Sequence, residues 1–167
     1  MQSIVLIGPP GAGKSTVAKC LSKILGMPVI DTDKVIEENT GRQIGEIFLT
    51  DGEAFFRNIE RETVLESLGR NESIIALGGG SVLDPEVELR LKDFQKVIFL
   101  NVSISNAAPR VGFNKERPLL VGNPRQQWLA LMEKRRPVYE RIATQIISTD
   151  NKKPQEVAQE IAKVLVS

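Results

Sequence analysis

The stretch Gly8-Pro9-Pro10-Gly11-Ala12-Gly13-Lys14-Ser15 matches the pattern G-x-x-x-x-G-K-[ST], which is typical of a phosphate-binding loop. It follows a short β-rich run at residues 3–7 and precedes a segment whose apolar residues recur at helical spacing until Gly26. In this setting backbone N–H groups point at a β-phosphate, and the helix N-terminus favours negative charge. We expect Lys14 to reach the β- and γ-phosphates and the Ser15 hydroxyl to bind Mg²⁺. The stretch therefore predicts a nucleotide-binding strand, loop and helix.

Strand-like and helical segments alternate along the rest of the chain. Further strands are predicted at residues 27–30, 73–77, 96–100 and 145–148. We expect Thr32 or Asp33 to cap the helix after the second strand, and Asp51-Gly52 to separate two later helices. This alternation predicts an α/β fold in three layers, in which a parallel sheet of about five strands is covered by helices on both faces.

One segment interrupts the alternation. Residues 112–124 hold two glycines and two prolines and show no sustained period. An ordinary surface loop would have this composition, but the segment also carries Arg117 and lies where the chain should cross the open end of the sheet. We therefore predict a single domain, 1–167, with a mobile lid at about residues 112–123 between core segments 1–111 and 124–167.

Composition excludes several classes of protein. The 167 residues suit one domain, and 22 Lys and Arg against 21 Asp and Glu give a net charge of +1, so no nucleic-acid partner is expected. The chain has no His and one Cys, which excludes His-based catalysis, a Cys/His zinc site and an intramolecular disulfide. No apolar run approaches the ~20 residues of a membrane span, and residues 1–14 lack a basic region followed by a long apolar stretch. We expect a cytoplasmic protein with no membrane partner.

Two features narrow the kind of phosphate-loop protein. Guanine-binding proteins use N-K-x-D, and the nearest match, Asn114-Lys115-Glu116-Arg117, has Arg where Asp is needed. Motor ATPases usually end a strand in Asp, whereas the predicted strands here are followed by Gly78 and Asn101. The pattern thus favours a small-molecule kinase over a GTPase switch or a motor.

Polar residues follow two of the predicted strands. Asp31-Thr32-Asp33 places two carboxylates at the carboxyl end of a strand, where α/β sheets bind ligands, although a helix cap alone would explain one of them. Gly78-Gly79-Gly80 allows the backbone to approach a ligand closely. Arg57 and Glu60 share a helical face, where the carboxylate could orient the guanidinium or form an ordinary surface salt bridge. One of the Asp31 and Asp33 carboxylates could face the metal and the other a substrate hydroxyl.

Three arginines could clamp anions. Arg117 lies in the predicted lid, and Arg135 and Arg136 lie at a predicted helix end just before Pro137.

Taken in order, these elements resemble shikimate kinase. The resemblance covers nearly the whole chain through the motifs GPPGAGKST, DTD, FRNIE, LGGGS, RPLL and RRPVY. It implies a fold like that of nucleoside monophosphate kinases, with strand order 2-3-1-4-5 and a substrate-binding region at about residues 33–61. It also implies a monomer that transfers the γ-phosphate of ATP to the 3-hydroxyl of shikimate, in the synthesis of chorismate and aromatic amino acids.

The resemblance assigns a role to each matching residue. Asp33 would accept from the attacking hydroxyl and act as base or orienting group, while Lys14 and Arg117 would stabilise the transferring phosphoryl group. The implied shikimate-binding residues are Asp33, Arg57, Gly78, Gly79, Gly80 and Arg135. The implied ATP-binding residues are Gly11, Ala12, Gly13, Lys14, Ser15, Thr16, Arg110, Arg117, Lys152 and Pro154. Mg²⁺ would be bound by Ser15 and, through water, by Asp31.

Some positions depart from the family pattern. Arg136 adjoins Arg135 and leaves open which of them holds a carboxylate, and Val138 stands where Leu is usual. Pro109 is expected to disturb a helix beside Arg110. Two alternative functions remain: another small kinase such as a gluconate-type kinase, or a non-catalytic ATP-binding regulator.

Overall fold

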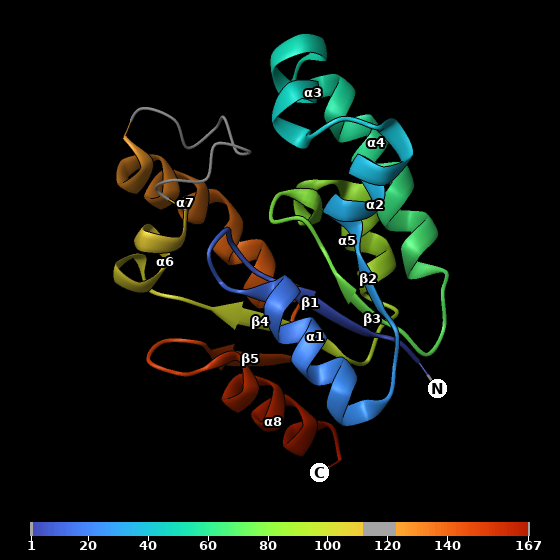
Figure 1. Ribbon diagram of the computed structural model, residues 1–167, viewed down its shortest axis with the longest axis vertical. Coiled ribbons are helices and arrows are strands. Elements are labelled where there is room, and N and C mark those ends of the chain that lie inside the picture. The colour runs from blue at the N-terminus through green and yellow to red at the C-terminus, as the bar shows by residue number, and fades with distance from the viewer. Residues whose placement is uncertain (1, 112–122, 167) are drawn as a thin grey trace.

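The computed structural model describes residues 2–111 and 123–166, without the side chains of 108–111. Five parallel strands form one sheet in the order β2-β3-β1-β4-β5 (Figure 1). The strands are β1 Ile4–Ile7, β2 Val29–Asp31, β3 Ile74–Ala76, β4 Val97–Asn101 and β5 Gln145–Ser148. The predicted α/β class and the strand order implied by the resemblance are both confirmed.

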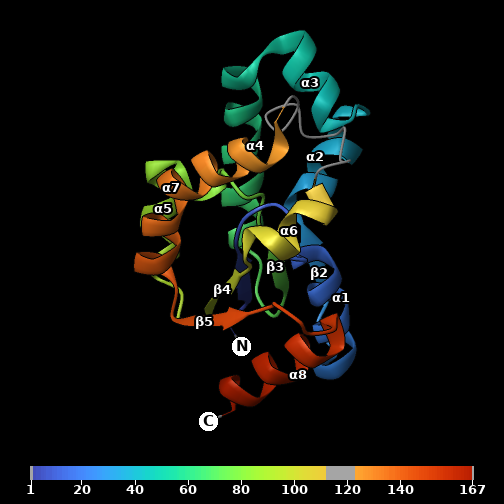
Figure 2. The ribbon, with the colours of Figure 1, turned by 90° about the vertical axis from the view of Figure 1, so that its left-hand side faces the viewer.

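Helices cover both faces of this sheet. They are α1 Lys14–Leu25, α2 Thr32–Thr40, α3 Ile44–Asp51, α4 Glu53–Leu68, α5 Pro85–Leu91, α6 Ile104–Val111, α7 Pro124–Ile142 and α8 Pro154–Leu165, with a 3-10 turn η1 at Ser81–Leu83. The side view shows α1 and α8 on one face and α5 and α7 on the other (Figure 2). None of the helices within 2–111 and 123–166 combines the length and the apolar composition needed to cross a membrane.

The main core lies on both sides of the central strands. Every residue of β1 and β3 is buried, because helices cover both faces of a parallel sheet and leave no side of the strand to water. Above the sheet, α2, α3 and α4 form an upper lobe, residues 32–68 (Figure 1). This lobe has a small apolar cluster of its own, made by Ile36, Ile44, Ile47 and Phe56.

The cap of α2 differs from the prediction. Its N-cap is Asp31, neither Thr32 nor Asp33, and the Asp31 carboxylate accepts a hydrogen bond from the Lys34 backbone N–H at 3.4 Å. Asp31 still has extended backbone angles as the last residue of β2, which is the geometry that an N-cap requires. Asp33 is thereby released from capping and lies inside the first helical turn.

Two prolines lie inside helices, contrary to the predictions. The helix that was expected to end before Pro137 runs on to Ile142. Proline removes one backbone donor, but Tyr139, two residues further on, is completely buried and fixes the helix against the core. Likewise α6 continues through Pro109 to Val111, because in the last turn the missing donor costs a single hydrogen bond.

Candidate active site

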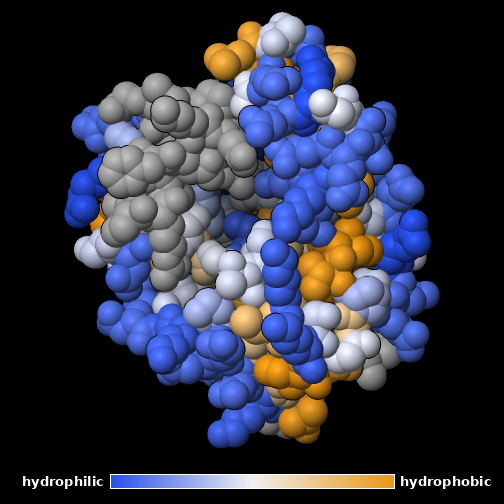
Figure 3. Space-filling model, in the orientation of Figure 1, coloured by the Kyte–Doolittle hydropathy of each residue, from blue (hydrophilic) through white to orange (hydrophobic). Residues whose placement is uncertain are grey.

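The phosphate loop lies between β1 and α1 at the carboxyl edge of the sheet. Gly13 starts α1 with a φ of 87°, a left-handed conformation that glycine adopts without strain. Lys14 Nζ donates to the carbonyl oxygens of Gly8 at 2.7 Å and Pro9 at 3.1 Å. The surface above α1 is hollowed near the centre of this face (Figure 3). The loop or the first turn of α1 contains the predicted residues Gly11, Ala12, Gly13, Lys14, Ser15 and Thr16.

Ser15 and Asp31 meet at the edge of this loop. The Ser15 hydroxyl donates to Asp31 Oδ2 and so joins the start of α1 to the end of β2. Mg²⁺ prefers oxygen ligands and usually keeps several waters, with one or two protein ligands beside the substrate phosphates. One hydroxyl and one neighbouring carboxylate therefore fit such an ion.

The turn after β3 brings two carboxylates together. A Cβ atom added at Gly78 would lie 2.8 Å from Asp33 Oδ1 and 2.8 Å from Glu60 Oε2. Asp33 comes from the first turn of α2 and Glu60 from α4, so the upper lobe supplies both groups. A side chain at position 78 would occupy the space that these oxygens need.

Two guanidinium groups converge on the next glycines. A Cβ atom at Gly80 would lie 2.8 Å from Arg57 Nη1 and 2.9 Å from Arg135 Nη2, and one at Gly79 would lie 3.0 Å from Arg135 Nη1. Arg57 comes from α4 and Arg135 from α7, on opposite sides of the turn. The two cations thus form one positively charged end of the site, with the carboxylate of Asp33 at the other.

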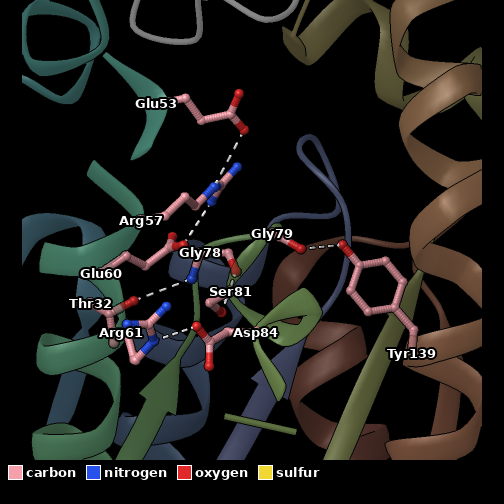
Figure 4. Close-up of polar contacts among 10 residues, drawn as sticks. All are labelled: Thr32, Glu53, Arg57, Glu60, Arg61, Gly78, Gly79, Ser81, Asp84 and Tyr139. Carbon is pink, nitrogen blue, oxygen red and sulfur yellow. Dashed lines mark hydrogen bonds and ion pairs between the residues drawn. The ribbon is translucent and has the colours of Figure 1, made fainter. Parts of the chain in front are cut away.

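Hydrogen bonds with three side chains hold the glycine turn. The backbone N–H of Gly78 donates to Thr32 Oγ1 at 3.2 Å, and the Ser81 hydroxyl donates to the Gly78 carbonyl at 2.7 Å. From the other side, the Tyr139 hydroxyl donates to the Gly79 carbonyl at 2.6 Å (Figure 4). The turn is therefore held from α2 and from α7 at once.

Arg57 is oriented by its own helix. Its Nη1 donates to Glu60 Oε1 at 2.7 Å, and its Nε lies 3.6 Å from Glu53 Oε1, so the three side chains form a row along α4 (Figure 4). Phe48 and Phe56 lie 5.9 and 5.4 Å from the guanidinium carbon. Glu60 is only 3% exposed, so this is not an ordinary surface salt bridge. Burial raises the pKa of the Glu60 carboxyl, and the Arg57 charge partly opposes that rise.

Arg135 and Arg136 point to different places. Arg135 is 4% exposed and reaches the glycine turn, whereas Arg136 Nη1 donates to Asn101 Oδ1 at 3.0 Å, at the end of β4. A pocket of about 480 Å³ opens beside the two guanidinium groups at the turn. Its lining comes from Glu53, Arg57, Glu60, Arg61, Gly80, Ser81, Leu83, Asp84, Pro85, Leu131, Lys134 and Arg135.

A comparison with protein families decides what this arrangement is. The family model for shikimate kinase matches residues 10–166. The chain belongs to the shikimate kinase family. The shikimate kinase of Streptomyces coelicolor is 47% identical over 156 residues, which cover 93% of this chain and 91% of that one. The sequence-based identification is confirmed: the chain is an ATP-dependent kinase that acts on shikimate.

Solved structures agree with this family. A shikimate kinase from Acinetobacter baumannii in complex with shikimate matches with a TM-score of 0.96 and 34% identity, covering 99% of this chain and 93% of that one. A gluconokinase from Sinorhizobium meliloti matches with a TM-score of 0.67 at 20% identity, covering 99% of this chain and 91% of that one. At that identity the gluconokinase shares the fold alone.

Two residues implied by the family resemblance, Lys152 and Pro154, lie outside this cluster, and two others lie outside the described part of the chain. Lys152 Nζ donates to Glu160 Oε2 on α8 at 2.8 Å, and Pro154 is the first residue of α8. Arg110 lies in α6, but its side chain is outside the described part of the chain, as are Arg117 and lid residues 112–122.

Sequence reasoning missed two aromatic residues of α7 that support the site. The indole N–H of Trp128 donates to the carbonyl of Pro10 at 2.9 Å, and Tyr139 holds Gly79. Together with Arg135 they are spaced by seven and four residues, which places all three on one helix face. Trp128 and Tyr139 are the only Trp and Tyr of the chain. Their spacing from Arg135 could have identified them as residues that support the site.

The two guanidinium groups lie so close to Gly80 that a methyl group added there should weaken shikimate binding. In Gly80→Ala, the added carbon must displace Arg57 and Arg135, so we expect KM for shikimate to rise at least about tenfold, because ångström-scale misplacement is costly. KM for MgATP should stay near the wild-type value. Steady-state kinetics measures both constants.

Gly69→Ala is the matched control for Gly80→Ala. It adds the same methyl group at the end of α4, outside the glycine turn. Equal KM values for shikimate in the two variants would contradict the role given to the turn.

Proposed function

We propose that this site transfers the γ-phosphate of ATP to the 3-hydroxyl of shikimate, giving shikimate 3-phosphate and ADP, in the synthesis of chorismate and aromatic amino acids. The observation that carries this assignment is the convergence of Asp33, Arg57 and Arg135 on one glycine turn beside the phosphate loop. Shikimate is a ring with one carboxylate and three hydroxyl groups. Two arginines suit the carboxylate, and an aspartate suits a hydroxyl.

Asp33 would take up the proton during transfer. The hydroxyl oxygen of shikimate forms a bond to the γ-phosphorus, the bond from that phosphorus to the β,γ-bridging oxygen breaks, and ADP leaves with the electron pair. The hydroxyl proton passes to the Asp33 carboxylate. Lys14 and Arg117 would stabilise the charge on the transferring group, which in phosphoryl transfer is the main task of the protein.

Ser15 and Asp31 would hold Mg²⁺, with Asp31 acting through a water molecule. The ion would neutralise negative charge on the phosphates of bound ATP. The hydrogen bond between the two side chains keeps both oxygen donors at the same edge of the loop.

Other parts of the assignment rest on the resemblance. Arg110, Lys152 and Pro154 would lie around the adenine, residues 112–123 would close over ATP, and residues 33–61 would bind shikimate. A monomer in the cytoplasm, with no nucleic-acid or membrane partner, stays a prediction.

A coupled ADP-release assay with MgATP tests the function directly. We expect release to be stimulated by shikimate, with no stimulation by gluconate or nucleoside monophosphates above the rate without acceptor. Phosphorus NMR of the product would show which hydroxyl carries the phosphate. Stimulation by gluconate, or tight ATP binding without any stimulated release, would overturn the assignment.

A further inference from the structure

Trp128 links α7 to the phosphate loop, although no part of the G-x-x-x-x-G-K-[ST] pattern calls for it. The side chain is 2% exposed, and its N–H donates to the Pro10 carbonyl at 2.9 Å across 118 positions of sequence. A buried indole N–H almost always has a partner, and here that partner is the backbone of the loop. The loop is therefore fixed to a helix far away in the chain.

Hydrogen bonds within the loop hold the carbonyls that precede Pro10. The carbonyls of Gly8 and Pro9 accept from Lys14 Nζ, and Pro9 also accepts from the Ala12 backbone N–H at 3.2 Å. Lys14 is also the residue that meets the phosphates in a phosphate loop. Trp128 thus supplies a restraint from a residue that has no part in binding phosphate.

The same helix face reaches the acceptor side of the site. Arg135 lies against Gly79 and Gly80, and Tyr139 donates to the Gly79 carbonyl. Moreover, a Cβ atom at Gly79 would lie 3.4 Å from Pro10 Cδ, so the glycine turn and the phosphate loop are in close contact. One helix, α7, therefore contacts both of the segments whose separation sets the distance between donor phosphate and acceptor hydroxyl.

We propose that Trp128 is a positioning residue that sets the phosphate loop at its working distance from the acceptor, through its hydrogen bond to the Pro10 carbonyl. This inference rests on the proposed phosphoryl transfer. Alignment of the reacting groups controls the rate of transfer more than the affinity for either substrate. Loss of the Trp128 donor is therefore expected to lower kcat and to leave KM largely unchanged.

The variant Trp128→Phe in the full chain tests this split. Loss of one hydrogen bond should lower kcat about threefold to tenfold, with both KM values within about twofold of wild type. Met132→Ala is the matched control, because Met132 lies one turn further along α7 in the same core and its loss also destabilises the helix. Its kcat, measured well below its Tm, should stay near the wild-type value.

Each result has one interpretation. Equal kcat values for Trp128→Phe and Met132→Ala would overturn the positioning role. The proposed function would still stand if the wild type shows shikimate-dependent turnover. A wild-type chain without such turnover would instead overturn the proposed function itself.

Two further measurements separate the hydrogen bond from packing. A benzothienylalanine at position 128 keeps the ring shape and replaces the N–H by sulfur, and it should lower kcat as the Phe variant does. An unchanged kcat would overturn the proposal even if Trp128→Phe fails to fold. Because the chain has one Trp, 5-fluorotryptophan labelling gives one fluorine resonance, which should shift on adding MgATP. A resonance that does not move would also contradict the proposal.

Discussion

Asp33→Asn is expected to lower kcat about 10²- to 10⁴-fold, the usual contribution of a positioned general base. The amide keeps the size of the side chain but cannot take up the proton of the attacking hydroxyl. Asp33 lies beside Gly78 and Glu60, which we assign to the acceptor side of the site. We therefore expect the Kd for MgATP to stay within about twofold of wild type, as measured by calorimetry.

Asp93→Asn provides the control for this substitution. Asp93 lies just after α5 with 74% of its side chain exposed, in an ion pair with Arg90 at 3.6 Å. The Asp93→Asn substitution makes the same chemical change away from the site and should leave kcat unaltered. A large loss of MgATP affinity in Asp33→Asn would contradict the assignment, since it would place this carboxylate on the nucleotide side.

Arg135→Lys is expected to raise KM for shikimate about 10- to 100-fold, because charged hydrogen bonds of this kind each contribute about 1.5–3 kcal/mol. Lysine keeps the positive charge, so the buried site is not left with an uncompensated carboxylate. It cannot, however, present the planar pair of donors that binds a carboxylate with two parallel hydrogen bonds. Shikimate saturation curves at saturating MgATP measure the change.

The neighbouring Arg136→Lys makes the same substitution one position away. Arg136 bonds to Asn101 and lies over Phe99, so KM for shikimate should remain close to wild type. A rise in KM as large as that of Arg135→Lys would show that the orientation of Arg135 is not what selects shikimate.

Local patterns in the sequence were sufficient for much of the fold. The strand–loop–helix at Gly8 to Ser15, the break at Asp51-Gly52 and the last strand are all set by neighbours within a few residues, and the structure has them as predicted. The strand order is a long-range property, and it came from the resemblance. The predicted end of α7 before Pro137 was wrong because the buried contacts of Tyr139 outweigh the local effect of one proline. The disturbance expected at Pro109 was wrong because a proline in the last turn of α6 costs a single hydrogen bond.

For the site, too, local sequence predicted some features, and others depended on contacts between distant parts of the chain. Residue types and order placed Asp33 and the three glycines at the carboxyl edge of the sheet, whereas the role of Arg57 in the site came from the resemblance. The choice between Arg135 and Arg136 could not be made, since it depends on which face of α7 meets the glycine turn. Trp128 was missed because its partner is a backbone carbonyl, and no property of the residue at position 10 shows that its carbonyl needs a donor from α7.

The separate apolar cluster of the upper lobe has an evolutionary consequence. Ile36, Ile44, Ile47 and Phe56 pack apart from the main core on the two faces of the sheet. Substitutions at distant sites that share no contacts have nearly additive effects on stability. Selection can therefore change the upper lobe, to which we assign shikimate binding, while the sheet keeps its packing. This separation gives a physical reason why the fold, which a gluconokinase shares at 20% identity, tolerates change in one lobe without loss of packing in the sheet.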